Sequence, residues 1–258
     1  MEDKIKKIAR TGYVSKGVVY TITGVLALNA AVGLGRSSEG KLGVIEFLEK
    51  QPFGKVLLCL MGIGLFCYAF WRFFQSIKNP ENIDDDAKGT GKRIGFFLSG
   101  LVYSGLGGYA IYQIFAASGG GGGNKAGMVP QDYLPYVFYA VALGLAIKSI
   151  FQLVKAYKGD FLGKFQLDTI SSVSTRSIVK YMGYAGLTAR GIIVGIVAYF
   201  FFNAAGTASA EKVKGTKEAF SFLRQNSEGA WLVGLVAFGL ICYGAYMFMM
   251  AGYRRFKD

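Results

Sequence analysis

Long apolar runs separated by short polar stretches dominate this chain of 258 residues. Six runs extend over about 13–32, 53–74, 94–117, 133–154, 186–205 and 230–251. Each has the length of roughly 20 residues that a helix needs to cross the hydrocarbon core of a bilayer. The pattern therefore predicts an all-α polytopic membrane protein with six transmembrane helices.

The first two spans recur as the last two. At an offset of 174 residues, Gly12 matches Gly186 and Lys16 matches Arg190; at 175 residues, Tyr68 matches Tyr243. A weaker middle copy aligns Tyr103 with Tyr20, and places Lys148 where the other copies have Tyr68 and Tyr243. We expect one membrane domain over 1–258, built from units at about 9–78, 91–158 and 178–256. Because each unit has two spans, the three repeats should be parallel, with pseudo-threefold symmetry about the membrane normal.

The connecting segments also carry patterns. Two predicted outer loops hold short amphipathic stretches, one with Leu42, Ile45 and Leu48 and one with Ala219, Phe220 and Leu223. We expect both to lie flat on the outer membrane surface. The middle unit has a glycine linker at 119–123 instead. The predicted inner loop at 159–179 places Phe161, Leu162, Phe165 and Leu167 among lysines, which suits a segment resting on the inner leaflet.

The net charge of +13 is distributed asymmetrically. If the N-terminus lies inside, 20 of the 29 Lys and Arg residues fall on the inner side. Cationic residues are retained on the cytoplasmic side during insertion, so both termini are expected in the cytoplasm. The basic residues thus follow membrane topology rather than indicating nucleic acid. A cleaved signal peptide is the competing interpretation of the basic N-terminus, but the repeat of the first helix late in the chain favours its retention.

Three segments resemble a known family. ARTGYVSKGVVY at 9–20, QPFGKVLL at 51–58 and GLFCYAFWR at 64–72 are similar to the bacterial membrane family called domain of unknown function 1206. The resemblance implies a multi-pass protein of the bacterial cell (inner) membrane with tandem two-helix units, commonly three. It implies no reaction, ligand or catalytic residue.

The types of residue that are missing limit the possible chemistry. The chain has no His, and its sixteen acidic residues fall outside the predicted spans. Haem ligation by His, His-based zinc catalysis, a His-containing triad and an intramembrane carboxylate proton relay are therefore excluded. We expect a protein that is not an enzyme and uses no cofactor or metal.

Cations inside the predicted spans are the sharpest signal. The candidate site residues are Lys148, Arg190, Lys16, Arg72, Tyr68 and Tyr243. Lys16 and Arg190 should lie about one turn inside the inner ends of their helices, and Lys148 deepest. One interpretation is that these long side chains extend to the inner headgroups. The other is a basic, tyrosine-lined site for an anionic lipid headgroup or small metabolite on the inner half.

Three classes of function remain open from these patterns. One is a lipid-binding or structural scaffold component of the membrane, whose partners are the bilayer and anionic lipid headgroups. Another is an assembly partner of a second membrane protein or of another copy of the chain. The alternative is a small transporter or channel for an anionic solute, with a basic vestibule on the cytoplasmic side. Parallel repeat bundles among metabolite carriers support the alternative only by architectural analogy.

Overall fold

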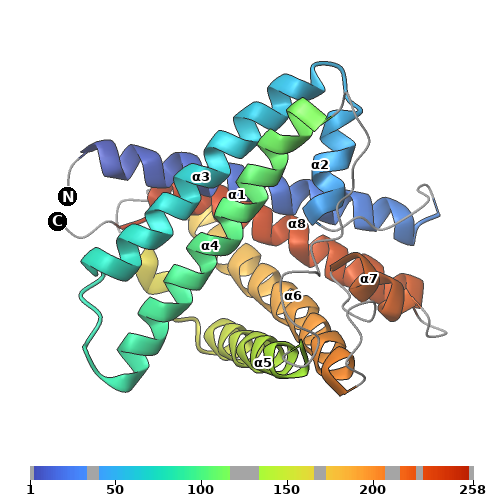
Figure 1. Cartoon of the computed structure of the whole chain (residues 1–258). Coiled ribbons are helices and arrows are strands. Elements are labelled where there is room, and N and C mark those ends of the chain that lie inside the picture. Colours follow the sequence, from blue (N-terminus) through green and yellow to red (C-terminus); the bar gives the residue numbers. More distant parts are fainter. Residues whose placement is uncertain are drawn as a thin grey trace.

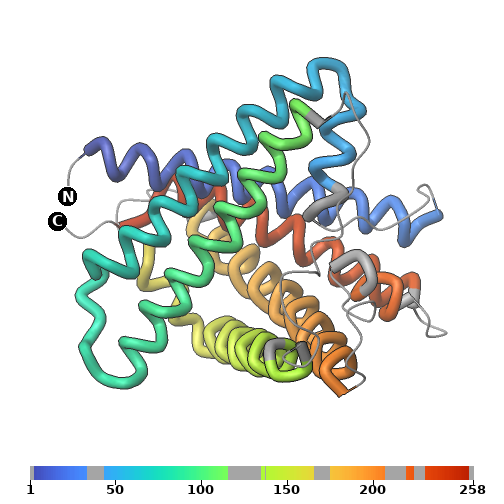
Figure 2. The backbone as a smooth tube through the Cα atoms, in the orientation of Figure 1, coloured from blue at the N-terminus to red at the C-terminus, as the bar shows by residue number. Residues whose placement is uncertain are grey.

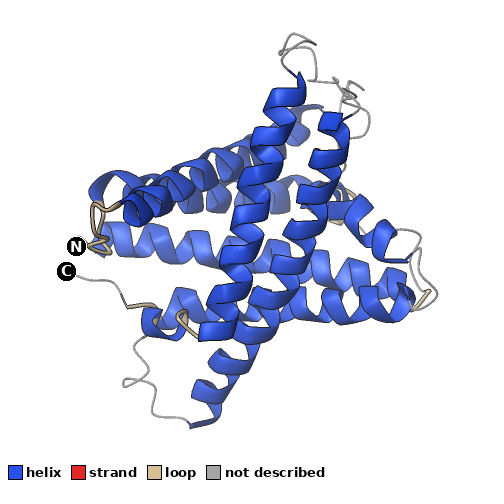
Figure 3. Ribbon diagram, turned by 90° about the horizontal axis from the view of Figure 1, so that it is seen from below, coloured by secondary structure: helices blue, strands red, loops and turns tan. Residues whose placement is uncertain are grey.

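The computed structural model describes residues 3–33, 41–116, 134–165, 173–206, 216–224 and 229–255. These residues are almost entirely helical, which confirms the all-α class (Figure 3). Six long helices are α1 (Asp3–Ala31), α3 (Gly54–Lys78), α4 (Ala87–Ala116), α5 (Leu134–Lys158), α6 (Val173–Gly206) and α8 (Gly229–Tyr253). Shorter elements are α2 (Lys41–Glu49), α7 (Thr216–Arg224) and the 3-10 turn η3 (Leu162–Lys164).

The six long helices are each long and apolar enough to cross a membrane, as the hydropathy pattern predicts. Several begin well before their apolar run. α1 starts at Asp3 and α6 at Val173, whereas the apolar runs start near 13 and 186. Hydropathy detects only the apolar part of a helix, and Lys and Arg sustain a helix well. The prediction that Lys16 and Arg190 lie one turn from a helix end is therefore wrong: both lie near the middle of long helices.

The long helices pack mainly as three antiparallel pairs, α1 with α8, α3 with α4 and α5 with α6 (Figure 1). Two further interfaces, α1 with α3 and α6 with α8, join the pairs to one another. The start of α1 and the end of α8 lie at the same end of the molecule (Figure 2), which we call the terminal side. Within their described residues, α4 and α5 share no extended contact. The row of helices is therefore open between them.

Glycines allow two of the crossings to be very close. An ideal Cβ on Gly12 would lie 2.5 Å from the Tyr68 backbone, and one on Gly186 would lie 2.5 Å from the Tyr243 backbone. Close packing replaces hydrophobic exclusion as the driving force inside a bilayer, so such contacts define helix interfaces. The first and last units thus share an equivalent contact at their equivalent residues. The pseudo-threefold symmetry of all three units stays a prediction.

The amphipathic segments form helices, but their apolar faces pack on protein. In α2, Val44 and Ile45 are buried beside α1 and α3; in α7, Ala219 and Phe220 are buried beside α6 and α8. These faces pack on protein because the ends of the splayed helices provide an apolar surface for them. That the two segments lie at the outer membrane surface stays a prediction. The linker at 119–123 lies outside the described residues.

The inner loop after α5 also differs from expectation. Phe161 and Phe165 are buried, and both pack edge-on against Tyr246 of α8. Phe165 forms an isolated antiparallel bridge with Arg254, and the Arg255 amide donates to the Lys164 carbonyl at 2.9 Å. The two phenylalanines therefore close the terminal side of the bundle rather than resting on the inner leaflet.

The two glycine crossings can be tested by adding one methyl group. We expect Gly12→Ala and Gly186→Ala to destabilise the protein by about 1–3 kcal/mol, because the new Cβ meets backbone that cannot move aside. The matched control is Gly95→Ala in α4, where nothing lies within 4 Å and helix propensity favours Ala by up to about 1 kcal/mol. Thermal unfolding in mild detergent measures the difference. Equal midpoints for all three variants would contradict the role of close packing.

Candidate functional site

Lys16 lies at the centre of the bundle, surrounded by aromatic rings. Its side chain is only 1% exposed. Its Nζ donates a hydrogen bond to the Tyr68 hydroxyl at 2.8 Å. Four rings surround the ammonium group, with centroids 4.5 to 5.9 Å from Nζ: Tyr20, Tyr68, Tyr103 and Tyr243. We call these four residues the tyrosine cage. Ring faces carry negative partial charge and attract cations, most strongly away from water.

The tyrosine cage joins four helices at depth in the bundle. Its members come from α1, α3, α4 and α8, and two pairs of rings meet edge to face with centroids 4.7 Å apart. Tyr68 lies ten residues before the end of α3, and Tyr243 lies ten residues before the end of α8. At 1.5 Å per residue, the cage lies about 15 Å from these helix ends. That depth is about half of a hydrocarbon core of roughly 30 Å.

Two arginines donate hydrogen bonds to different tyrosines of the cage. Arg72 of α3 donates through Nε to the Tyr68 hydroxyl at 2.8 Å, and its guanidinium lies 5.0 Å from the Phe96 ring of α4. Arg190 of α6 donates through Nε to the Tyr20 hydroxyl at 2.9 Å and through NH1 to the Tyr243 hydroxyl at 3.0 Å. The same NH1 donates to Gln152 Oε1 of α5 at 2.8 Å. Three cations thus share hydroxyl acceptors that carry no charge.

A second layer lies between the cage and the terminal side. Trp71 donates through Nε1 to the Tyr13 hydroxyl at 2.9 Å, and Arg254 also donates to that hydroxyl. The Arg254 guanidinium lies 5.2 Å from both the Tyr13 and the Trp71 ring centroids. This layer separates the cage from the water on the terminal side.

A carboxylate ties the loops of the terminal side together. Glu81, in the loop between α3 and α4, binds Arg254 after α8 and Lys164 of η3, the latter at 3.1 Å. Burial alone would raise the pKa of Glu81, but Lys164 and Arg254 more than offset it and lower the pKa to about 2. Burial lowers the pKa of Lys164 to about 8, although Glu81 opposes this shift. Both groups are therefore charged at pH 7.

The cluster carries an excess of positive charge. Five cations contribute to it: Lys16, Arg72, Arg190, Arg254 and Lys164. Glu81 pairs with Arg254 and Lys164, whereas Lys16, Arg72 and Arg190 donate to tyrosine hydroxyls. Hydroxyls and rings satisfy donors without neutralising charge. A charged side chain at the centre of a bilayer costs about 2.5–3.5 kcal/mol on insertion scales. An anion reaching the partly exposed Arg72 and Arg190 would reduce that cost.

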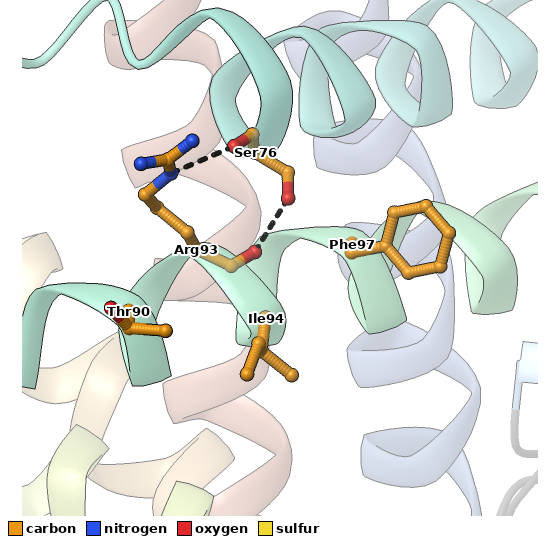
Figure 4. A pocket seen from close by; sticks show the side chains of 5 residues that line it. All are labelled: Ser76, Thr90, Arg93, Ile94 and Phe97. Carbon is orange, nitrogen blue, oxygen red and sulfur yellow. Dashed lines mark hydrogen bonds between the residues drawn. The ribbon is translucent and has the colours of Figure 1, made fainter. Parts of the chain in front are cut away.

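A separate hollow lies where the terminal-side ends of α3 and α4 meet (Figure 4). Arg93 Nε donates to the Ser76 carbonyl at 2.9 Å, while Ser76 Oγ donates to the Arg93 carbonyl at 2.8 Å. Arg93 also pairs with Asp85 at 3.0 Å. Thr90, Ile94 and Phe97 complete the lining. Because Arg93 is already paired with a carboxylate, this hollow holds α3 to α4 and offers an anion little.

The structure brings together five of the six sequence-predicted site residues: Lys16, Arg72, Arg190, Tyr68 and Tyr243. Lys148 is exposed on α5 and lies outside the tyrosine cage. Although it lies well inside its helix, its side chain is not buried by the rest of the bundle. Lys16 does not extend to the headgroups, because its ammonium group binds Tyr68 in the interior. The repeat alignment had lined Lys148 up with Tyr68 and Tyr243, but α5 turns Gln152, not Lys148, toward Arg190.

Sequence reasoning missed several members of the cluster. Tyr13, Trp71, Gln152, Glu81 and Arg254 all contact it. Tyr20 and Tyr103 could have been found, because the repeat alignment already matched them and both enter the cage. Glu81 and Arg254 lie 173 residues apart, and nothing in the local sequence indicates that they meet.

Comparison with known proteins agrees with this architecture. The family model described as Domain of Unknown Function (DUF1206) matches residues 11–79 and 185–254. The first segment contains α1 and α3 and the second contains α6 and α8, which are the helices of the two equivalent glycine–tyrosine crossings. The chain belongs to the DUF1206 family. A Bacillus subtilis (strain 168) relative named "Uncharacterized protein YxxB" is 31% identical over 253 residues, covering 97% of this chain and 91% of the relative. No solved structure matches this DUF1206 chain.

Removing the shared acceptor of the cage should destabilise the protein. In Tyr68→Phe, Lys16 and Arg72 lose a buried hydroxyl, and hydrogen bonds to charged groups contribute about 1.5–3 kcal/mol each. We expect a loss of about 2–4 kcal/mol in unfolding free energy in detergent. The control Tyr157→Phe changes a tyrosine that is 90% exposed and should have little effect. Similar losses in both variants would show that the cage does not stabilise the fold.

The stabilisation that Glu81 provides by pairing with Arg254 and Lys164 should depend on pH. Because the folded-state pKa of about 2 lies below the ordinary 4.5, its stabilisation is complete above pH 4.5 and is lost as the pH falls toward 2. The shift corresponds to at most about 3 kcal/mol.

Glu81→Gln should therefore unfold at a lower temperature than the unsubstituted protein at pH 7, and this difference should shrink between pH 4.5 and pH 2. The control Asp85→Asn alters a carboxylate whose side chain is 87% exposed and should change neither value appreciably. A Glu81→Gln variant as stable as the unsubstituted protein at pH 7 would contradict the tie.

Proposed function

We propose that this protein is a non-enzymatic component of the bacterial cell membrane that binds the headgroup of an anionic lipid at its cation–tyrosine cluster. In this proposal both termini lie in the cytoplasm, so the terminal side faces the inner leaflet. The asymmetric distribution of Lys and Arg supports that orientation.

The observation that carries the proposal is the excess of positive charge around the tyrosine cage. Arg72 and Arg190 are each bonded to tyrosine hydroxyls and remain partly exposed. A guanidinium offers five donors in a planar fork that suits the oxygens of phosphate or carboxylate. An anion bound at the exposed part of such a guanidinium would supply the charge that the tyrosines lack.

The cover on the terminal side favours a lipid over a solute from the cytoplasm. Phe161 and Phe165 close that side against Tyr246, and the Glu81 tie connects three loops across it. A small anion from water would have to displace both. A lipid headgroup approaches from within the membrane and meets neither.

Native mass spectrometry of the gently purified protein tests the proposal. We expect one retained anionic lipid, reduced at least tenfold in Arg190→Gln, which removes a guanidinium of the cluster. Lys148→Met, at an exposed position that should leave folding intact, should also reduce retention. The matched control is Lys180→Met, which removes an exposed lysine from α6 outside the cluster.

Retention that is equal in all four proteins, or absent in all four, would contradict the proposal. Release of a small anionic metabolite in place of lipid, together with anion flux in liposomes, would instead favour a transporter with a basic vestibule. A protein partner retained irrespective of Lys148 and Arg190 would favour a scaffold.

A further inference from the structure

The opening between α4 and α5 coincides with the basic side of the cluster. Every other sequential pair of long helices is packed together, whereas these two share no extended contact within their described residues. They are also the least buried of the six long helices. Glycines on both have open space around them: nothing lies within 4 Å of an ideal Cβ on Gly95 of α4 or Gly144 of α5.

One side of α5 presents a row of polar residues to this opening. Lys148, Gln152 and Lys155 are spaced i, i+4 and i+7, which places them on one side of a helix. Gln152 is the buried member of this row, because its Oε1 accepts from Arg190 in the bundle interior, whereas Lys148 is exposed. Lys155 is half-buried, on the part of α5 that lies nearer the terminal side. Lys155 and Lys148 are seven residues apart, or about 10 Å along the axis.

The facing side of α4 is mainly apolar. Gly100 and Gly107 pack on α3, and Tyr103, a turn away, contacts Tyr20 in the interior with 3.4 Å between the hydroxyl oxygens. Continuing around the helix in the same direction, at 100° per residue, leads past Ser99, Leu106 and Gly95 to Val102. Leu101 lies on the opposite flank, beyond Phe97, which contacts Phe73 of α3. Val102 is 54% exposed and Leu101 is 51% exposed.

Arg190 lies at the inner end of this route. Its Nε and NH1 bond to tyrosines and to Gln152, while its NH2 makes no hydrogen bond among the described residues. An incoming acceptor can therefore bind NH2 without displacing a partner.

We propose that an anionic phospholipid of the inner leaflet enters sideways between α4 and α5. Its phosphate moves along Lys155 and Lys148 to Arg190, while its acyl chains remain in the bilayer beside Val102. This inference rests on the proposed function and adds its route. The lysines explain how a phosphate can lie about 15 Å from the terminal-side helix ends, because a charge entering hydrocarbon otherwise loses its hydration without compensation.

Site-specific photo-crosslinking tests the route. A benzophenone amino acid is placed at Val102 or, as the matched control, at Leu101, in nanodiscs of phosphatidylcholine with a minor fraction of phosphatidylglycerol. We expect Val102 to crosslink phosphatidylglycerol at least fivefold above its share of the bilayer, and Leu101 to crosslink both lipids in proportion to their abundance. Arg190→Gln should remove the preference at Val102. Gly95→Phe, which fills the opening, should also remove it, whereas Gly105→Phe on the other flank of α4 should not.

The outcomes separate the route from the proposed function. Proportional crosslinking at both positions, with phosphatidylglycerol still retained in native mass spectrometry, would overturn the route and leave lipid binding standing. Loss of retention and of preference together would overturn both. A preference at Val102 that survives Arg190→Gln would show that the lipid enters without binding that residue, which also overturns the inference.

Discussion

The burial of a single ammonium group organises this bundle. Lys16 lies about 15 Å from the terminal-side helix ends, at a depth where an unpaired charge is costly. The fold offsets this cost by distributing weak interactions over four rings and one hydroxyl, supplied by four different helices. Each ring has to lie within about 6 Å of the charge to contribute. The position of Lys16 therefore constrains α1, α3, α4 and α8 at once.

The same logic extends to the partners of the cage. Tyr68 accepts hydrogen bonds from both Lys16 and Arg72, and Tyr20 and Tyr243 both accept from Arg190. The shared tyrosine hydroxyls hold the positively charged side chains of Lys16, Arg72 and Arg190 near one another, but they carry no negative charge that would act as a counter-ion. Such an arrangement leaves the positive charge of the three side chains uncompensated by the tyrosines.

Much of the fold was predictable because hydropathy and internal repetition act over long stretches. The six spans and the equivalence of Gly12 with Gly186 follow from pattern alone. The alignment also matched Tyr103 with Tyr20, and both rings face Lys16. Helix rotation was not predictable in the middle unit, because α5 packs through Ser149 and Gln152 and turns Lys148 outward. Loop ties such as Glu81 with Arg254 depend on tertiary contacts that carry no local signal.

The packing of α1 against α8 joins the first long helix of the chain to the last. During synthesis at about 5–20 residues per second, Lys16 precedes Tyr68 by several seconds and Tyr243 by roughly 10 to 50 s. For that interval the lysine has only part of its eventual surroundings. The surroundings that stabilise the buried ammonium group are therefore complete only after α8, the last helix of the chain, has been made.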